Sequence, residues 1–343
     1  MTSTGTTRKT LIVIAAVVVL FGALLCSTLV GPAGLSPRGV LLDLLNAVPL
    51  VDVDSGLTAQ QHAILWNIRL PRVVLGTLVG ATLAIAGAAY QGVFRNPLAD
   101  PYLLGVSSGA GLGATLAIVA GLGAGTFGIP VAAFVGGVAA VTATYMLGRS
   151  VGGNRSEVVI ILAGVAVAAF ANAGQTFVMQ RYSDSLKQVY SWLLGRLSTN
   201  GWTDVVVVLP YVAVTIVVIL LFGRMLDVMA VGDVEAASLG VNPARVRLLL
   251  VAIATLGTAA VVSVSGLIGF VGIVVPHAVR LLVGPGHRLL LPLSLVVGAT
   301  FLVLADLLAR TVMSPAELPI GVVTAAIGAP FFLVVLRRSR GVA

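Results

Sequence analysis

Residues 69–117 read RLPRVVLGTLVGATLAIAGAAYQGVFRNPLADPYLLGVSSGAGLGATLA, two Gly/Ala-rich apolar runs around an Asn-Pro-Leu-Ala-Asp-Pro turn. Small residues recur at every fourth position of each run, at Gly76, Gly80, Ala84 and Ala88 and then at Gly105, Gly109, Gly113 and Ala117. On helices this spacing forms a ridge of small residues along one face. Such ridges let membrane helices approach closely. The stretch therefore predicts two closely packed transmembrane helices joined at residues 96–101.

The composition indicates an integral membrane protein. Of the 343 residues, 58% are hydrophobic and 9% are charged, and the mean hydropathy is +1.10; soluble domains carry about 25% charged residues. Apolar runs of about 20 residues recur, which indicates helices rather than a β-barrel. Neither lysine, Lys9 nor Lys187, follows a glycine, so the sequence contains no Walker-type ATP loop. No nucleophile–base pair or metal-ligand cluster is evident, so we expect no enzymatic activity, cofactor or metal site in this chain.

Ten apolar segments divide the chain, and we predict a single all-α transmembrane domain over residues 1–343. The segments fall at about residues 11–30, 61–94, 104–120, 130–148, 157–180, 203–222, 246–264, 266–282, 288–308 and 318–336. With ten spans, both termini lie on the same side. This topology places thirteen of the twenty Lys and Arg residues inside, which agrees with the positive-inside rule and puts both termini in the cytoplasm. The same bias explains the net charge of +8, so this charge does not indicate that the chain binds nucleic acid.

Three of the outer cations, Arg69, Arg72 and Arg310, lie at the ends of apolar spans. One interpretation is that they snorkel to lipid headgroups. The other is that they present a cationic patch to an acidic partner through bidentate carboxylate pairs. The residue types do not decide between the two. Asp306 precedes Arg310 by four residues, so we expect these two side chains to pair.

Residues 226–241 are too polar to span a bilayer. Within them, a short amphipathic helix outside the membrane is predicted, closed by a glycine. Its residues are Gly232, Asp233, Glu235, Ala236, Ala237, Ser238, Leu239 and Gly240. A surface loop helix and a helix received by a groove in a cytoplasmic partner both fit this pattern. The second interpretation would let a separate ATPase drive a chain that has no ATP site.

The segment at 157–180 carries Asn172, Gln175, Thr176 and Gln180. The first three are spaced i, i+3, i+4 and share a helix face. Polar side chains at this depth usually face a cavity or another helix. A secondary ion-coupled transporter is the rival function, and it would need acidic groups inside the spans. Asp306 is the candidate for that role, with Arg310 beside it.

Several motifs between about residues 61 and 330 resemble the FecCD-type permeases, the membrane subunits of ABC importers for iron–siderophore, haem and cobalamin. They are Arg69-Leu-Pro-Arg72, Asn96-Pro-Leu-Ala-Asp-Pro101, Leu104-Gly-Val-Ser-Ser-Gly-Ala-Gly111, Gly232–Gly240, Gly266-Leu-Ile-Gly-Phe-Val-Gly272, Val275-Pro-His-Ala-Val-Arg280 and Glu317-Leu-Pro-Ile-Gly-Val-Val-Thr324.

The resemblance implies a type II ABC importer permease with ten helices, paired with a second permease subunit in the bacterial cytoplasmic membrane. It implies an ATPase dimer that binds ATP and Mg and receives the 232–240 helix. It implies that Arg69, Arg72 and Arg310 meet glutamates of an extracytoplasmic substrate-binding protein. The polar residues of the 157–180 span and the 181–195 segment would line the pathway.

The resemblance also places an inner gate at Asn154, Arg155, Ser156 and Glu157, although Glu157 departs from the small hydroxyl residues expected there. Iron–siderophore is the expected cargo because that branch of the family is the broadest; the residues do not separate it from haem or cobalamin. A homodimer and a heterodimer both remain open.

Overall fold

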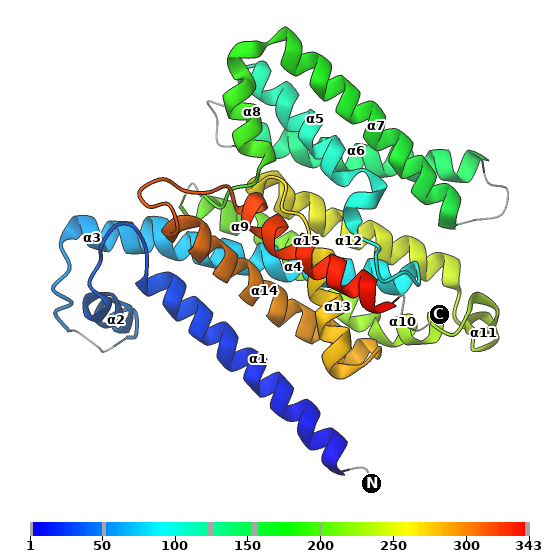
Figure 1. Ribbon diagram of the computed structural model, residues 1–343, viewed down its shortest axis with the longest axis horizontal. Helices are drawn as coiled ribbons and strands as arrows, with labels where there is room; N and C mark the ends of the chain where they lie inside the picture. The colour runs from blue at the N-terminus through cyan, green and yellow to red at the C-terminus, as the bar shows by residue number, and fades with distance from the viewer. Residues whose placement is uncertain (1–2, 50–52, 123–126, 152–156, 199–200, 340–343) are drawn as a thin grey trace.

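The computed structural model describes residues 3–49, 53–122, 127–151, 157–198 and 201–339, in which the regular structure is helical (Figure 1). Seven helices are long and apolar enough to cross a membrane, and three shorter apolar helices accompany them. Together they correspond to the ten predicted segments, and the all-α class is confirmed.

The long helices are α1 (Ser3–Leu29), α4 (Leu70–Val93), α6 (Gly128–Val151), α7 (Glu157–Arg181), α9 (Thr203–Leu221), α12 (Pro243–Ser265) and α14 (His287–Thr311). The shorter apolar helices are α5 (Val106–Val119), α13 (Val271–Val283) and α15 (Ile320–Ser339). Short connecting helices are α2 (Pro37–Leu45), α3 (Ala59–Ile64), η1 (Leu65–Arg69), η2 (Pro101–Leu104), η4 (Ser183–Ser185), α8 (Leu186–Leu193), α10 (Gly223–Met229) and α11 (Asp233–Ser238).

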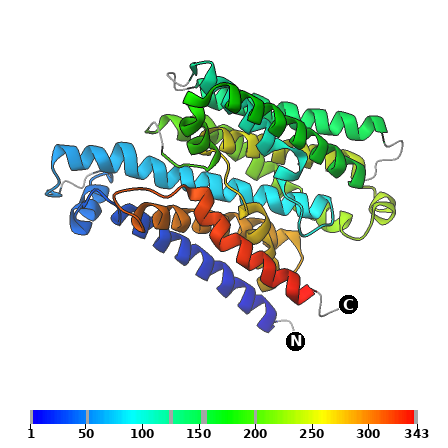
Figure 2. The ribbon, with the colours of Figure 1, turned by 45° about the horizontal axis from the view of Figure 1, so that its top comes forward.

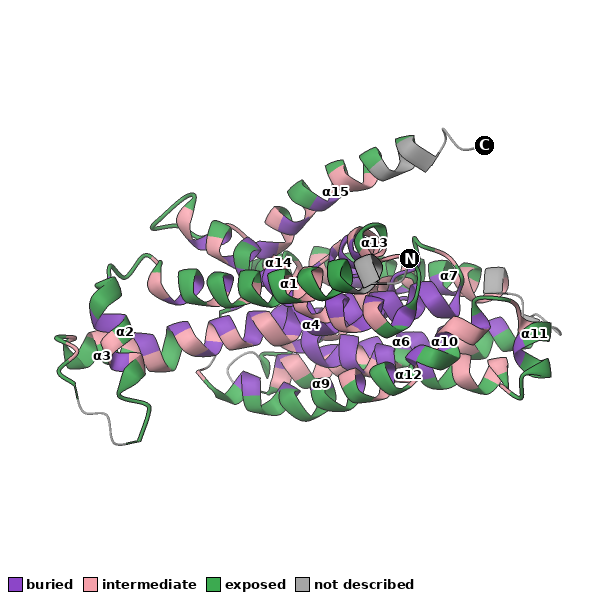
Figure 3. Cartoon of the chain, turned by 90° about the horizontal axis from the view of Figure 1, so that it is seen from below, coloured by how far each residue is buried: buried purple, intermediate pink, exposed green. Residues whose placement is uncertain are grey.

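Helix α4 is the centre of the molecule. Together with α3 and the π-helical turn η1, it forms a continuous 35-residue helix, Ala59–Val93, whose most apolar window is 83% buried. It packs against α9, α12, α13 and α14, and Figure 3 shows it as the most buried of the long helices. Helix α1, by contrast, lies at the periphery with only 11% of its window buried.

The predicted ridges are the places where helices touch backbone to backbone. A Cβ on Gly80 would overlap the carbonyl oxygen of Gly298 in α14. In the second run, a Cβ on Gly109 would overlap the carbonyl oxygen of Gly136 in α6. Each ridge therefore packs against a small residue on a different helix, and not against the other ridge.

Helices α5, α6, α7 and α8 form a second group (Figures 1 and 2). This group joins the α4-centred bundle mainly where α5 and α6 pack against α12. Along the helix axes, α2 and α3 lie at one end of the molecule, whereas α11 and the C-terminal helix end lie at the other (Figure 1). We call these the outer end and the inner end.

The Gly80 contact leads to a first prediction. Gly80→Ala should lower the free energy of unfolding in detergent by about 1–3 kcal/mol, because the added methyl forces α4 and α14 apart. Gly22→Ala in α1 is the matched control, since a Cβ there meets nothing within 4 Å. Thermal unfolding of the purified chain measures both, and equal stability of the two variants would contradict close α4–α14 packing.

Candidate functional site

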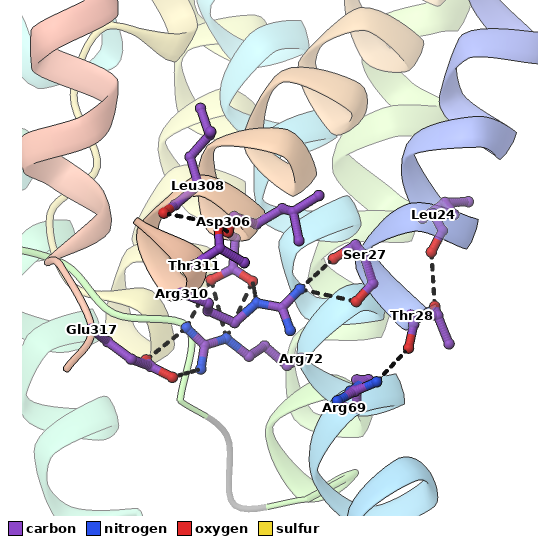
Figure 4. A network of polar contacts seen from close by, with 11 residues as sticks. Leu24, Ser27, Thr28, Arg69, Arg72, Asp306, Leu308, Arg310, Thr311 and Glu317 are labelled. Carbon is purple, nitrogen blue, oxygen red and sulfur yellow. Dashed lines mark hydrogen bonds and ion pairs between the residues drawn. The ribbon is translucent and has the colours of Figure 1, made fainter. Parts of the chain in front are cut away.

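The three outer arginines do not form an exposed patch, and this part of the prediction is wrong. Arg69 and Arg310 are only 4% and 3% exposed, and the side chain of Arg72 is 11% exposed. Their guanidinium groups turn inward to helix ends and carboxylates of the same chain (Figure 4). The physical reason is that unpaired backbone carbonyls and a buried carboxylate lie within their reach.

Arg69 and Arg310 hold the carbonyl end of α1. Arg69 Nη1 donates hydrogen bonds to the carbonyl oxygens of Thr28 at 2.9 Å and Leu29 at 3.2 Å. Arg310 Nη2 donates to the carbonyl oxygen of Ser27 at 2.9 Å and to its Oγ at 2.7 Å. Both cations lie where the negative end of the α1 dipole is strongest.

Asp306 is the centre of the same network. Arg72 donates to its Oδ1 from Nη2 at 2.9 Å and from Nε at 3.1 Å. Arg310 Nε forms an ion pair with Oδ2 at 3.0 Å, which confirms the predicted i, i+4 pairing. Arg72 then reaches Glu317 with two further hydrogen bonds of 2.9 Å. A carboxylate bound by two guanidinium groups is poorly suited to carry a proton or cation, which weakens the ion-coupled alternative.

The Asn-Pro-Leu-Ala-Asp-Pro turn docks on the break between α12 and α13. Tyr102 Oη donates to the carbonyl oxygen of Ile268 at 3.1 Å, and Gln91 Nε2 donates to that of Gly272 at 3.1 Å. Arg280 Nη1 in turn donates to Gln91 Oε1 at 2.9 Å. Both motifs are evident in the sequence, but their contact is not. The signal for it is that two Gly/Pro-rich interruptions both have polar residues beside them.

Asp100 closes this turn. Its Oδ1 accepts a hydrogen bond of 2.8 Å from the backbone N–H of Tyr102. Burial raises the pKa of the Asp100 carboxyl to about 6, although the Tyr102 N–H opposes the shift. A Cβ on Gly272 would lie 2.8 Å from Asp100 Oδ2 and 3.1 Å from the carbonyl oxygen of Leu83, so a side chain would be crowded where the turn meets α13.

The polar residues of α7 divide into two groups. Asn172, Thr176 and Gln180 are exposed and follow one another at intervals of four along the helix. Gln175 was expected among them, and this is wrong: it is buried, and its Nε2 donates to Thr115 Oγ1 of α5 at 3.1 Å. The Gln175 side chain is one methylene longer than that of asparagine, and Gly111 of α5 lies opposite it. The Gln175 amide can therefore insert between α7 and α5.

Around α7, the remaining predicted residues are only partly described. Asn154, Arg155 and Ser156 of the expected gate lie outside the described residues, and Glu157 begins α7. The 181–195 segment, expected along the pathway, contains α8, in which Tyr190 is exposed and Trp192 is buried.

At the inner end, the predicted helix is present as α11. Val234 and Leu239 are 79% and 68% exposed, while Ala236 is buried against the protein. Asp233 forms ion pairs of 3.2 Å with Arg95 and with Arg247, and these tie the start of α11 to the end of α4 and to α12. A short polar helix that exposes large apolar side chains is typical of a protein-binding surface.

Comparisons with known proteins identify the family of this chain. Residues 14–338 match the FecCD transport family over nearly the whole chain. The chain belongs to the FecCD transport family. It is 40% identical to the cobalamin import system permease protein BtuC of Halobacterium salinarum, over 94% of this chain and 95% of that one. It is 35% identical to the Fe(3+)-citrate import system permease protein YfmE of Bacillus subtilis, over 96% of each chain.

A solved structure of a metal-chelate type ABC transporter in an inward-facing conformation superposes on the FecCD chain with a TM-score of 0.82. The two are 30% identical, and the match covers 95% of this chain and 99% of that one. The resemblance predicted from the motifs, to permeases of ABC importers, is therefore confirmed.

The buried and exposed halves of the arginine network should respond differently to neutralisation. Asp306→Asn should cost about 3–5 kcal/mol of unfolding free energy, because it leaves Arg72 and Arg310 without their shared buried counter-charge. Glu317→Gln should cost about 1 kcal/mol or less, since the Glu317 side chain is 41% exposed. Thermal unfolding in detergent tests this ranking, and a Glu317 effect as large as that of Asp306 would overturn it.

Proposed function

We propose that the chain is one of two permease subunits of an ATP-driven importer, and that it carries a metal chelate, an iron–siderophore, inward across the cytoplasmic membrane. The observation that carries this proposal is α11. A family member without an ATP loop needs an external energy source, and α11 offers an exposed apolar surface at the inner end. Both termini are then cytoplasmic, on the side of α11.

In this proposal, an ATPase subunit receives residues 226–241. The Val234 and Leu239 side chains would enter its groove, as amphipathic helices do in helix-in-groove complexes. The ion pairs of Asp233 with Arg95 and Arg247 would carry the displacement of α11 into α4 and α12. ATP and Mg would bind to the ATPase. Closure of the ATPase dimer around the nucleotide would switch the permease between its outward-open and inward-open states.

The substrate-binding protein would dock at the outer end. Of the three arginines predicted to receive it, Arg72 lines a cavity at the outer end, whereas Arg69 and Arg310 are buried. A cavity of about 220 Å³ is lined by Arg72, Arg196 and Glu317, and the Arg196 side chain is exposed there. Acidic groups of the binding protein would pair with Arg196 and compete with Glu317 for Arg72. Arg69 and Arg310 would stabilise this surface from inside the protein, because they bind the end of α1 and Arg310 also pairs with Asp306.

The pathway would lie between two permease subunits. Along α7, the exposed amides and hydroxyl of Asn172, Thr176 and Gln180 stand among exposed apolar residues such as Phe170 and Phe177, which are 80% and 72% exposed. A wall of this kind gives a bulky chelate scattered hydrogen bonds without a tight site. The binding protein would then set most of the affinity for cargo.

Cobalamin or haem is the alternative cargo. One relative is named for cobalamin and another for Fe(3+)-citrate, so a single permease architecture serves both kinds of chelate. A ferric chelate is favoured here for two reasons. One relative is named for Fe(3+)-citrate, and the iron–siderophore branch is the broadest in the family. Ligand screening of the binding protein that cooperates with this chain separates the three cargoes.

Substitutions on α11 test the proposed coupling. Val234→Asp and Leu239→Asp should each weaken binding of the ATPase subunit at least about tenfold, because each places a charge in an apolar contact. ATP-dependent uptake by the reconstituted importer should fall with it. Val312→Asp is the matched control, since Val312 is 65% exposed and follows α14 at the outer end, away from residues 226–241. Unchanged ATPase binding by both α11 variants would refute the role of α11.

A further inference from the structure

The inner end contains a cavity that the proposed function does not use. It measures about 560 Å³ and lies where the ends of α4 and α6 and the beginnings of α7 and α12 meet. Its polar side is formed by three arginines, Arg149, Arg245 and Arg247. Its remaining wall is largely apolar, with Phe94, Ile160 and Val251 among the lining residues.

The cations of this cavity come from two separate helices. Arg149 lies in the last turn of α6, and its guanidinium lies over the ring of Tyr145 with 5.7 Å between Cζ and the ring centroid. Arg245 and Arg247 lie in the first turns of α12, whose first N–H groups are capped by Asn242. Arg247 contacts Asp233 at 3.2 Å, while Arg149 and Arg245 are exposed. Arginines from α6 and α12 thus line the same cavity, whose remaining wall is largely apolar.

The position of the cavity along the helices points to the membrane surface. On α6, Met146 and Leu147 are 66% and 47% exposed, and Arg149 follows directly. On α12, Leu248 and Leu249 are 43% and 39% exposed, directly after the two arginines. On both helices the transition from exposed apolar to basic side chains falls beside the cavity. This is the level at which phospholipid phosphates lie.

We propose that this cavity binds the headgroup of an anionic phospholipid from the inner leaflet, with the phosphate held by Arg149 and Arg245 and the glycerol and upper acyl chains against the apolar wall. The proposal rests on the inward orientation of α11 given above. Basic pockets between transmembrane helices on the cytoplasmic side are typical sites for anionic headgroups. The apolar wall favours a lipid over free phosphate, which would leave that surface uncovered.

The site adjoins the proposed coupling region. Arg247 contributes to the cavity and also binds Asp233 at the start of α11. A bound headgroup would add negative charge beside Arg247, and so would act on the same ion pair that ties α11 to α12. Lipid composition would then influence how α11 is held.

Titration of the purified full chain with dioleoylphosphatidylglycerol, followed by native mass spectrometry, tests the proposal without the ATPase or any transport reaction. Its failure would therefore leave the importer assignment untouched. Arg149→Gln and Arg245→Gln should each weaken binding about fivefold, the effect of one basic residue near an anionic surface. Arg245→Lys should bind the lipid nearly as well as the wild type, because it keeps the positive charge. This variant therefore separates loss of charge from misfolding. Arg288→Gln is the matched control, because Arg288 is exposed at the inner end in α14 and does not line the cavity.

Dioleoylphosphatidylcholine should compete poorly, and inorganic phosphate at millimolar concentration should not displace the lipid. Displacement by inorganic phosphate would assign the site to a free anion and overturn the proposal. An equal loss in Arg288→Gln would reduce the effect to general surface charge. Unchanged lipid binding in the cavity variants, together with weaker binding of the ATPase subunit, would make the cavity a protein-docking surface instead.

Discussion

The close contact of α4 with its neighbours is the constraint on which the rest of the structure depends. Gly80 meets the backbone of Gly298 in α14, and Gly87 meets that of Gly272 at the start of α13. At such contacts even one methyl group has no room, so dispersion between backbones holds the helices in one register. The break between α12 and α13 is thereby held beside α4, where the turn at residues 96–101 closes over it.

The two ends of the bundle differ in how their polar groups are satisfied. At the outer end, Asp306 and the α1 carbonyls bind the arginines within the chain, which makes a fixed platform. At the inner end, α11 keeps Val234 and Leu239 exposed and is joined to the bundle by the buried Ala236 and by the ion pairs of Asp233. The outer polar groups are thus satisfied within the chain, whereas the inner helix leaves large apolar side chains exposed.

The sequence predicts the membrane class, the ten segments and α11, because apolar length, proline and glycine act locally. It does not predict where long side chains turn. Arg69 and Arg310 sit at span ends, where snorkelling and docking are both plausible, yet their partners are carbonyls of α1 some 41 and 283 residues away. Likewise, the i, i+3 spacing that groups Gln175 with Asn172 cannot reveal that Gly111 leaves space for Gln175 on α5. Only tertiary packing decides these directions.

The central claim is that this permease moves a chelate only when an ATPase and a delivery protein act on its two ends. The most direct measurement is uptake of a ferric siderophore into proteoliposomes that contain the permease dimer, with ATPase subunit, binding protein and ATP each present or omitted. Uptake is expected only when all are present, with ATP on the α11 side. Uptake by the permease alone, without ATP, would contradict it.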